Sequence, residues 1–197
     1  EITTRLVGSE MCIRDSLGRV EWIKLFGALL GKEEAAERIF QEQADILNRI
    51  SEDQPSEKTV AFFFVSSNGM VQVRQSSDYI PRMIELAGGR YVFENLGDPE
   101  SRKATMNMQA EEFYHKARNA DFLIYNSSID GGIATMKELL DKCEFLEDFQ
   151  AVKEGNVWCT SNDMYQQSLS IGYLMEDMHR MLQGDDTSPM HYLFEVQ

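Results

Sequence analysis

TVAFFFV, residues Thr59 to Val65, is the stretch that decides the fold. It is a continuous apolar run of residues that favour β structure, the pattern of a strand covered by other layers on both faces. DFLIYN, residues 121–126, is a second strand of this kind. VWCT, residues 157–160, is a third, which we expect to be the last strand of the chain. Strands of this type predict a parallel sheet between two layers of helices.

Helices are predicted between these strands. Ser77 or Asp78 can cap a helix that runs to Leu86, because both side chains can accept hydrogen bonds from its first turn. Gly88 and Gly89 then end it. The other predicted elements are short strands at residues 70–74 and 91–93 and helices at 107–118, 134–142, 144–152 and 168–182. This alternation predicts an α/β fold, a three-layer sandwich with a mostly parallel sheet.

A long helix is predicted before the first strand. From Val20 to Ile50, apolar residues recur at three-to-four spacing without a proline, and two glycines weaken the pattern. A helix of this length spans roughly 45 Å, more than a compact half-domain, so we expect it to tie two bodies together. Pro55, in a charged segment, marks its end. We therefore expect an inter-lobe helix at 17–51 and an α/β lobe at 52–197.

Residues 1–16 are set aside from this reasoning. LVGSEMCIRDS, residues Leu6 to Ser16, closely matches the translation of a transposase-end adapter used in preparing DNA libraries. We expect the natural chain to begin near Leu17, and anything encoded upstream, including a signal peptide or a whole first lobe, to be missing. A native disordered tail is the alternative.

Composition excludes several classes of partner and site. The net charge of −14 argues against nucleic acid and anionic lipid, since both need a basic surface. Cys143 and Cys159 lack the spacing of a zinc site or a disulfide framework, and are most simply small, partly buried residues. No apolar run approaches the roughly 18 residues that span a bilayer.

Signatures of catalysis are missing from the sequence. It contains no GxSxG elbow, no glycine-rich phosphate loop and no HExxH motif. His115, His179 and His191 are scattered singly. We therefore expect no catalytic residues, no metal ligands and no cofactor.

Three motifs, read in order, resemble a known family. They are DYIPRMIELAGGRYVFENL at 78–96, MQAEEFYHKARNADFLIYN at 108–126 and FQAVKEGNVWCTSNDMYQ at 149–166. With the long helix before them, they resemble the second half of an iron-complex-type substrate-binding protein of an ABC importer, over residues 17–197. The resemblance implies two α/β lobes joined by one helix and a ligand such as a ferric siderophore, haem or cobalamin. It also implies a partner permease and an extracytoplasmic location, either periplasmic or as a cell-surface lipoprotein whose lipid anchor, in the missing N-terminal part, makes the only membrane contact.

The ligand is expected at one edge of the sheet. In open α/β sheets, ligands bind outside the carboxyl ends of the strands, here residues 66–68, 126–128 and 160–165. Aromatic walls with an arginine suit a large, partly apolar, anionic chelate. Tyr125 and Trp158 are about equally well explained as core residues. The candidates for ligand contact are Arg74, Tyr79, Tyr125, Asn126, Trp158 and Tyr165.

The resemblance also implies a docking carboxylate. Family members present a surface glutamate of each lobe to arginines of the permease, and the matching position here is Glu111 or its neighbour Glu112. The alternative is that an acidic residue in the first turn simply complements the helix dipole.

These observations predict the binding component of an importer for a chelated metal, with a ferric siderophore first and haem or cobalamin next. A receptor for another solute and an α/β enzyme domain are the alternatives; the enzyme would need a phosphate loop or clustered Cys and His. If a first lobe is missing, Trp22, Phe26 and Leu29 should be unusually exposed.

Overall fold

The computed structural model describes residues 18, 20–97, 103–164, 170–184 and 189–197. The predicted decisive strand is β1 (Thr59–Val65), and β5 (Phe122–Tyr125) and β6 (Val157–Thr160) continue the sheet parallel to it. β3 (Arg90–Tyr91) also pairs with β1 in parallel, near its amino end. The centre of the sheet is therefore parallel, as predicted.

Antiparallel strands extend the sheet on both sides. The strand order is β4-β2-β1-β5-β6-β7, with β3 paired to β1 beside this path. β2 (Val71–Arg74) returns from β1 through a tight hairpin, and β4 (Thr105–Met108) pairs with β2. β7 (Leu193–Glu195) pairs with β6, so the prediction that residues 157–160 form the last strand is wrong.

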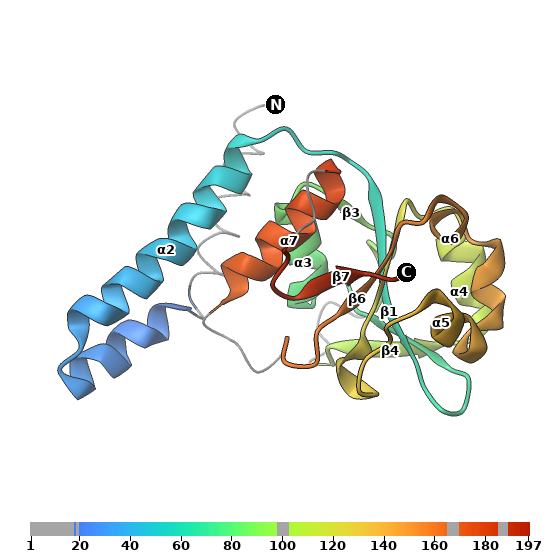
Figure 1. Cartoon of the computed structure of the whole chain (residues 1–197), viewed down its shortest axis with the longest axis horizontal. Helices are drawn as coiled ribbons and strands as arrows, with labels where there is room; N and C mark the ends of the chain where they lie inside the picture. Colours follow the sequence, from blue (N-terminus) through green and yellow to red (C-terminus); the bar gives the residue numbers. More distant parts are fainter. Residues whose placement is uncertain (1–17, 19, 98–102, 165–169, 185–188) are drawn as a thin grey trace.

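Helices cover both faces of the sheet (Figure 1), which confirms the three-layer sandwich. On one face lie α3 (Tyr79–Leu86) and α7 (Ile171–Gln183), and α2 (Glu33–Glu52) packs outside α7. The other face carries α4 (Ala110–Ala117), α5 (Met136–Lys142) and α6 (Gln150–Glu154), with the short helix η2 (Glu144–Asp148) packed against all three; a second short helix, η1 (Ser127–Ile129), follows β5.

Side chains of β1 alternate between the two helical layers, because successive residues of a strand point to opposite faces. The Phe63 ring lies 4.8 Å from the Phe113 ring of α4, measured between centroids. Phe62 points the other way, with the Arg74 guanidinium 5.7 Å from its ring centroid on the α3 side. Both phenylalanines are fully buried, which explains the continuous apolar sequence of this strand.

The predicted helix at 107–118 begins too early. Residues 105–108 form β4, in which Asn107 lies opposite Gln72 of β2, and α4 starts only at Ala110. These residues, TMNM, alternate polar and apolar side chains, which is the period-two pattern of a strand, so the sequence did hold a signal for β4.

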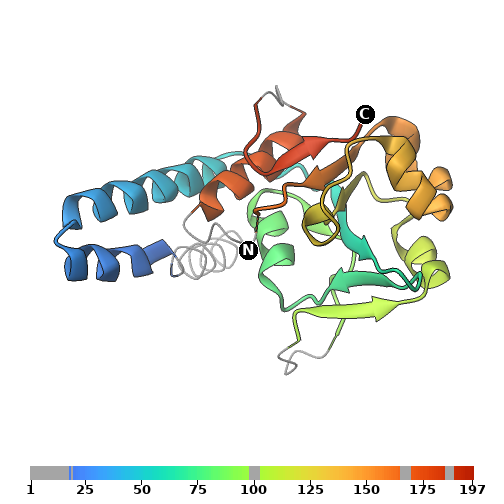
Figure 2. The ribbon, with the colours of Figure 1, turned by 60° about the horizontal axis from the view of Figure 1, so that its bottom comes forward.

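The prediction of a single long helix at residues 17–51 is also wrong. The helical segment at residues 20–30 ends at Gly31, which takes the left-handed φ of 64°, and α2 then runs back beside that segment (Figure 2). Gly27 permits the close approach, since a Cβ there would lie 2.5 Å from the Ala36 Cβ. The two glycines therefore make a helical hairpin instead of one rod.

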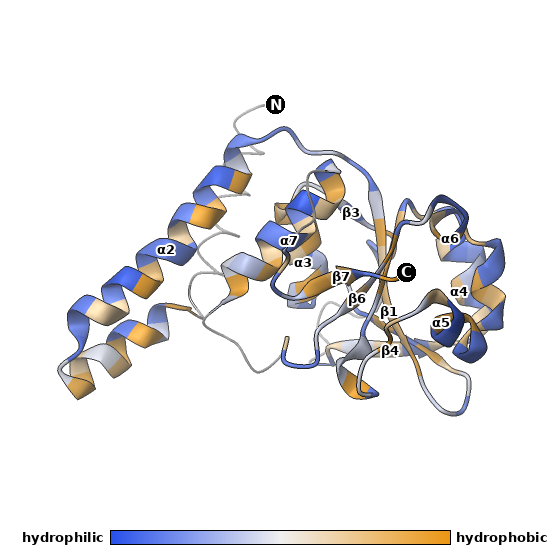
Figure 3. Cartoon of the chain, viewed as in Figure 1, coloured by the Kyte–Doolittle hydropathy of each residue, from blue (hydrophilic) through white to orange (hydrophobic). Residues whose placement is uncertain are grey.

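The two arms of this hairpin are covered very differently. In α2, Gln43 is buried and its Oε1 accepts a 2.8 Å hydrogen bond from the Gly172 amide at the start of α7. In the other arm, Trp22, Phe26 and Leu29 are exposed by 59%, 57% and 71%, and Figure 3 shows apolar residues along it. The predicted exposure of these three side chains is confirmed. Among the described helices, none combines the length and apolar character needed to cross a membrane.

Candidate functional site

Three loops meet at the carboxyl edge of the parallel strands, which we define as residues 66–70, 126–132 and 160–164. The loops follow β1, β5 and β6, whose paired registers bring their ends to one edge. Hydrogen bonds at this edge join β5 to β1, where the Asn126 amide donates to the Phe63 carbonyl at 2.8 Å, and join the second loop to the third, where Asn162 Nδ2 donates to the Gly131 carbonyl at 3.3 Å. The three strand ends therefore lie at one edge of the sheet, as predicted, and two of its loops are hydrogen-bonded to each other.

The Asn126 side chain lies beneath the carboxyl edge and forms hydrogen bonds with its hydroxyl groups. Its side chain is only 3% exposed, and its Oδ1 accepts hydrogen bonds from Ser128 Oγ at 2.6 Å and Thr160 Oγ1 at 3.4 Å. The Ser127 amide donates to Thr160 Oγ1 at 3.1 Å, and Ser127 Oγ donates to the Thr160 carbonyl. Asn126 therefore positions the hydroxyl groups, while the half-buried Ser128 lies nearer the surface.

Tyr125 and Trp158 lie in the core on opposite faces of the sheet. Tyr125 is fully buried opposite Phe63, and its hydroxyl donates to Asp130 Oδ2 at 2.8 Å. Burial and the neighbouring carboxylate together raise the pKa of Tyr125. Trp158 is 5% exposed and pairs with Ile124, which puts it on the other face. Neither ring presents a surface to a ligand in this structure.

Arg74 and Tyr79 come together, but beside the sheet and below its carboxyl edge. Arg74 follows Val73, the partner of Phe63, and so lies beside the middle of β1. Its Nη1 is 3.6 Å from Asp78 Oδ1, its guanidinium lies 6.0 Å from the Tyr79 ring centroid, and its side chain is 12% exposed. Its charge is therefore balanced within the protein. Tyr165 lies outside the described residues.

Glu111 and Glu112 occupy the exposed first turn of α4. This turn starts just after Met108, which pairs with Val71 at the carboxyl-edge side of β2. Glu112 forms an ion pair with Lys116 at 2.9 Å, whereas Glu111 has no ion pair in the described part of the chain. Of the two candidates, Glu111 thus carries the more available charge.

Sequence reasoning missed Asp130 and the glycines that follow it. Asp130 accepts from Tyr125 and also forms an ion pair with Lys142 of α5. Gly131 and Gly132 take φ values of 87° and 100°, which few other residues adopt, and so turn the loop sharply. The Asp-Gly-Gly sequence in the loop that follows a two-faced strand was the available signal.

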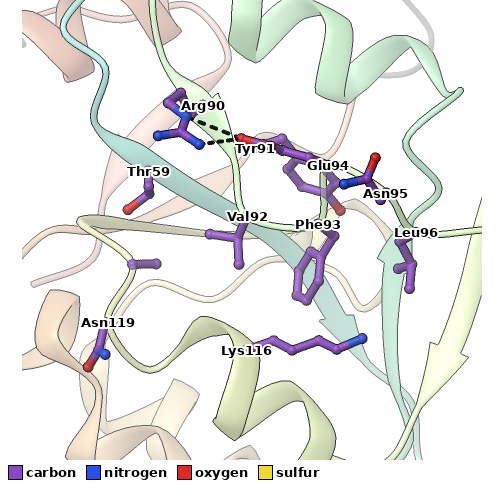
Figure 4. A pocket seen from close by; sticks show the side chains of 11 residues that line it. Thr59, Arg90, Tyr91, Val92, Phe93, Glu94, Asn95, Leu96, Lys116 and Asn119 are labelled. Atoms are coloured by element: carbon purple, nitrogen blue, oxygen red, sulfur yellow. Dashed lines mark hydrogen bonds and ion pairs between the residues drawn. The ribbon is translucent and has the colours of Figure 1, made fainter.

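A pocket of about 560 Å³ lies elsewhere, toward the amino ends of β1 and β5 (Figure 4). The segment after β3 forms one wall and the end of α4 the other, with Thr59 and Asn119 at one end. Arg90 pairs with Glu94 at 2.7 Å, and Lys116 is held by Glu112, so both bases are occupied. Within the described ranges, no three His, Cys, Asp or Glu side chains gather as metal ligands.

Comparison with solved structures agrees with this architecture. A TroA-like periplasmic binding protein from Veillonella parvula superimposes with a TM-score of 0.66 at 14% identity, over 89% of this chain and 60% of that one. A periplasmic haem-binding protein from Pseudomonas aeruginosa gives a TM-score of 0.61 at 14% identity, over 92% of this chain and 65% of that one. At these identities the likeness concerns the fold.

Sequence comparison establishes the family as well as the fold. A lipoprotein from Methanocaldococcus jannaschii is 32% identical over 168 residues, which cover 84% of this chain and 39% of that protein. The chain spans between 39% and 55% of the length of the curated relatives it matches. A family model described as periplasmic binding protein matches residues 7–163, including part of the segment whose adapter origin stays a prediction. The chain therefore belongs to the periplasmic binding protein family, whose members bind ligands outside the cytoplasm, in the periplasm or at the cell surface.

Proposed function

We propose that the chain is the substrate-binding component of an ABC importer for a chelated metal, with a ferric siderophore as the first candidate and haem or cobalamin as alternatives. The observation that carries this proposal is the carboxyl edge, where three loops rich in hydroxyl and amide groups follow neighbouring parallel strands in a protein of this family. A large chelate offers many carbonyl and hydroxamate oxygens, which such groups can bind.

The outward side chains of the edge suit a partly apolar chelate. Asn68 and Asn162 are exposed, and Ser128 is half-buried, so amide and hydroxyl groups face the ligand side. Ile129 is 56% exposed on the same loop as Ser128 and adds an apolar contact. A surface with apolar area and a few placed polar groups is the usual composition of a ligand site.

Four of the six candidate residues take two roles in this proposal. Tyr79, which is half-buried beside Arg74, stays a candidate for direct contact. Tyr125, Asn126 and Trp158 lie beneath the surface and support the loops instead. A side chain that fixes the position of a contacting group affects binding through that group.

The permease contact is assigned to Glu111 under the same proposal. Its side chain is exposed on the rim of the carboxyl edge and carries no ion pair in the described residues, whereas Glu112 is paired with Lys116. An unpaired carboxylate on a rim is suited to set recognition of a basic partner.

Calorimetry on the full-length gene product tests the binding proposal, because a two-lobed receptor would share the ligand contacts between its lobes. We expect saturable binding of a ferric trihydroxamate, of haem or of cobalamin, with the affinity reduced about fivefold or more in Asn162→Ala because one ligand hydrogen bond is lost. Asn119→Ala, an amide at the opposite end of the strands, is the matched control. No binding of any of the three, or an effect of the control alone, contradicts the proposal.

A further inference from the structure

The carboxyl edge carries no positive charge of its own. Residues 66–70, 126–132 and 160–164, all described by the structure, contain no lysine and no arginine. They contain two carboxylates, Asp130 and Asp163. The polar groups that this edge turns outward are therefore neutral or negative.

Two basic side chains from neighbouring described elements, Lys142 and Arg74, are each paired with a carboxylate. Lys142 reaches this region from α5, but its ammonium pairs with Asp130, the carboxylate that also accepts from the Tyr125 hydroxyl. Arg74 is paired with Asp78, and both side chains are nearly buried. Each base is thus neutralised by a carboxylate inside the lobe, and the net charge of −14 adds a negative field around it.

We propose that this edge selects chelates without free carboxylates, that is, neutral or cationic ones. The inference rests on the proposed function and names the class of substrate. The side-chain amides of Asn68 and Asn162 can donate to neutral oxygens, and Ile129 can cover apolar surface, but these three loops offer no cation to a carboxylate. This proposal reverses the expectation of an anionic chelate. That expectation depended on an Arg74 guanidinium available to the ligand, and the guanidinium is paired with Asp78. Haem, with its free propionates, falls in the disfavoured class.

A matched set of ligands tests the selection. One linear ferric trihydroxamate scaffold is prepared with a free terminal ammonium, with that amine acetylated, and with it succinylated to carry a carboxylate. We expect the carboxylate form to bind about tenfold or more weakly than the acetylated form at low salt, with a smaller gap at high salt because ions screen the repulsion.

The outcomes separate the two proposals. If the carboxylate form binds as tightly as the acetylated form, or more tightly, the charge selection is overturned while the importer function stands. If none of the three forms binds, the charge selection and the siderophore proposal are both overturned.

A charge added at the edge locates the effect. Asn162→Lys is expected to reduce the gap between acetylated and carboxylate forms about tenfold, since an ion pair replaces a neutral contact. Asn119→Lys adds the same charge at the amino ends of the strands and serves as the control. Equal shifts in both variants would mean that overall charge sets the preference, which overturns the assignment to this edge.

Discussion

The two ends of the same parallel strands are built for different purposes. At the amino end, Asp121 Oδ2 accepts from the Thr59 amide at 2.7 Å and from the Thr59 hydroxyl at 2.6 Å, and the Asp121 amide donates back to Thr59 Oγ1 at 3.0 Å. At the carboxyl end, Asn68 Oδ1 accepts from Ser66 Oγ at 2.6 Å and Asn162 Nδ2 donates to the Gly131 carbonyl at 3.3 Å, but both side chains remain exposed. The amino end uses its polar groups to join β1 to β5, whereas the carboxyl end leaves exposed amides that the proposed ligand could contact.

The largest expected effect concerns the buried thiols of Cys143 and Cys159. Burial raises the pKa of each to about 12, above the roughly 8.5 of a thiol in the unfolded chain. A raised pKa means that stability is complete below the unfolded value and falls as pH rises toward 12, by about 1.4 kcal/mol per pH unit for each thiol. From pH 7 to pH 10, urea unfolding should therefore show a loss of about 4 kcal/mol from the two thiols.

A single substitution isolates this loss. Cys159 is fully buried in β6 directly under the carboxyl edge, so Cys159→Ala should lose about half as much stability over the same pH range, whatever it costs at pH 7. An identical pH dependence in the variant and the parent chain would show that this thiol does not titrate with unfolding.

The next effect tests the amino end. Asp121→Ala should lower the free energy of unfolding by about 3 kcal/mol, because the Thr59 amide and hydroxyl lose a charged acceptor. Asp148→Ala removes a carboxylate that is exposed and only pairs with Lys153, and should change little. Urea denaturation of both variants gives the comparison; ligand affinity is expected to be unchanged in each. If Asp121→Ala lowers the free energy of unfolding by less than about 1 kcal/mol, this contact does not have the structural role given to it here.

Asn126 should affect both the stability of the fold and the binding of the ligand. Asn126→Ala leaves Thr160 Oγ1 and Ser128 Oγ without their shared acceptor, so we expect a loss of stability of about 1 to 2 kcal/mol together with weaker ligand binding. Urea denaturation and calorimetry on the same preparation measure the two effects. Unchanged affinity in a destabilised variant would separate Asn126 from the ligand site.

The smallest effect on stability and ligand affinity is expected for Glu111, on the rim of the carboxyl edge. Glu111→Ala should leave stability and ligand affinity unchanged and strongly reduce uptake when the variant is placed in the complete importer. Glu112→Ala, with its partner Lys116, is the matched control for removing a charge from the same turn. Uptake at the parent rate in Glu111→Ala, with expression matched, would exclude this residue as the permease contact.

The sequence predicts best those elements whose structure is determined by residues close together in the chain. The strand at 59–65 and the helix capped by Asp78 were predicted correctly, since apolar runs and caps act within a few residues; Asp78 Oδ1 accepts from the Ile80 amide at 3.1 Å. β7 was missed because a distant residue holds it: buried Asp177 of α7 accepts from the amides of residues 191–193.

The candidate site was predicted less completely, for related reasons. The edge itself followed from strand order, but the positions of Tyr125 and Trp158 depend on register, and one residue of shift exchanges the two faces. Arg74 suggested an available cation, although its partner Asp78 stands only four residues away. The pairing depends on the turn into α3, which places the two side chains together.

The most direct test of a ligand site at the carboxyl edge is a paramagnetic broadening experiment. The neutral ferric trihydroxamate is titrated into isotopically labelled chain, with its diamagnetic gallium complex as the reference. The proposed site predicts that amide signals of Asn68, Ser128 and Asn162 broaden first, while those of Asn95 and Asn119 in the amino-end pocket stay sharp. Broadening that begins at Asn95 and Asn119 and spares the three loops would contradict it.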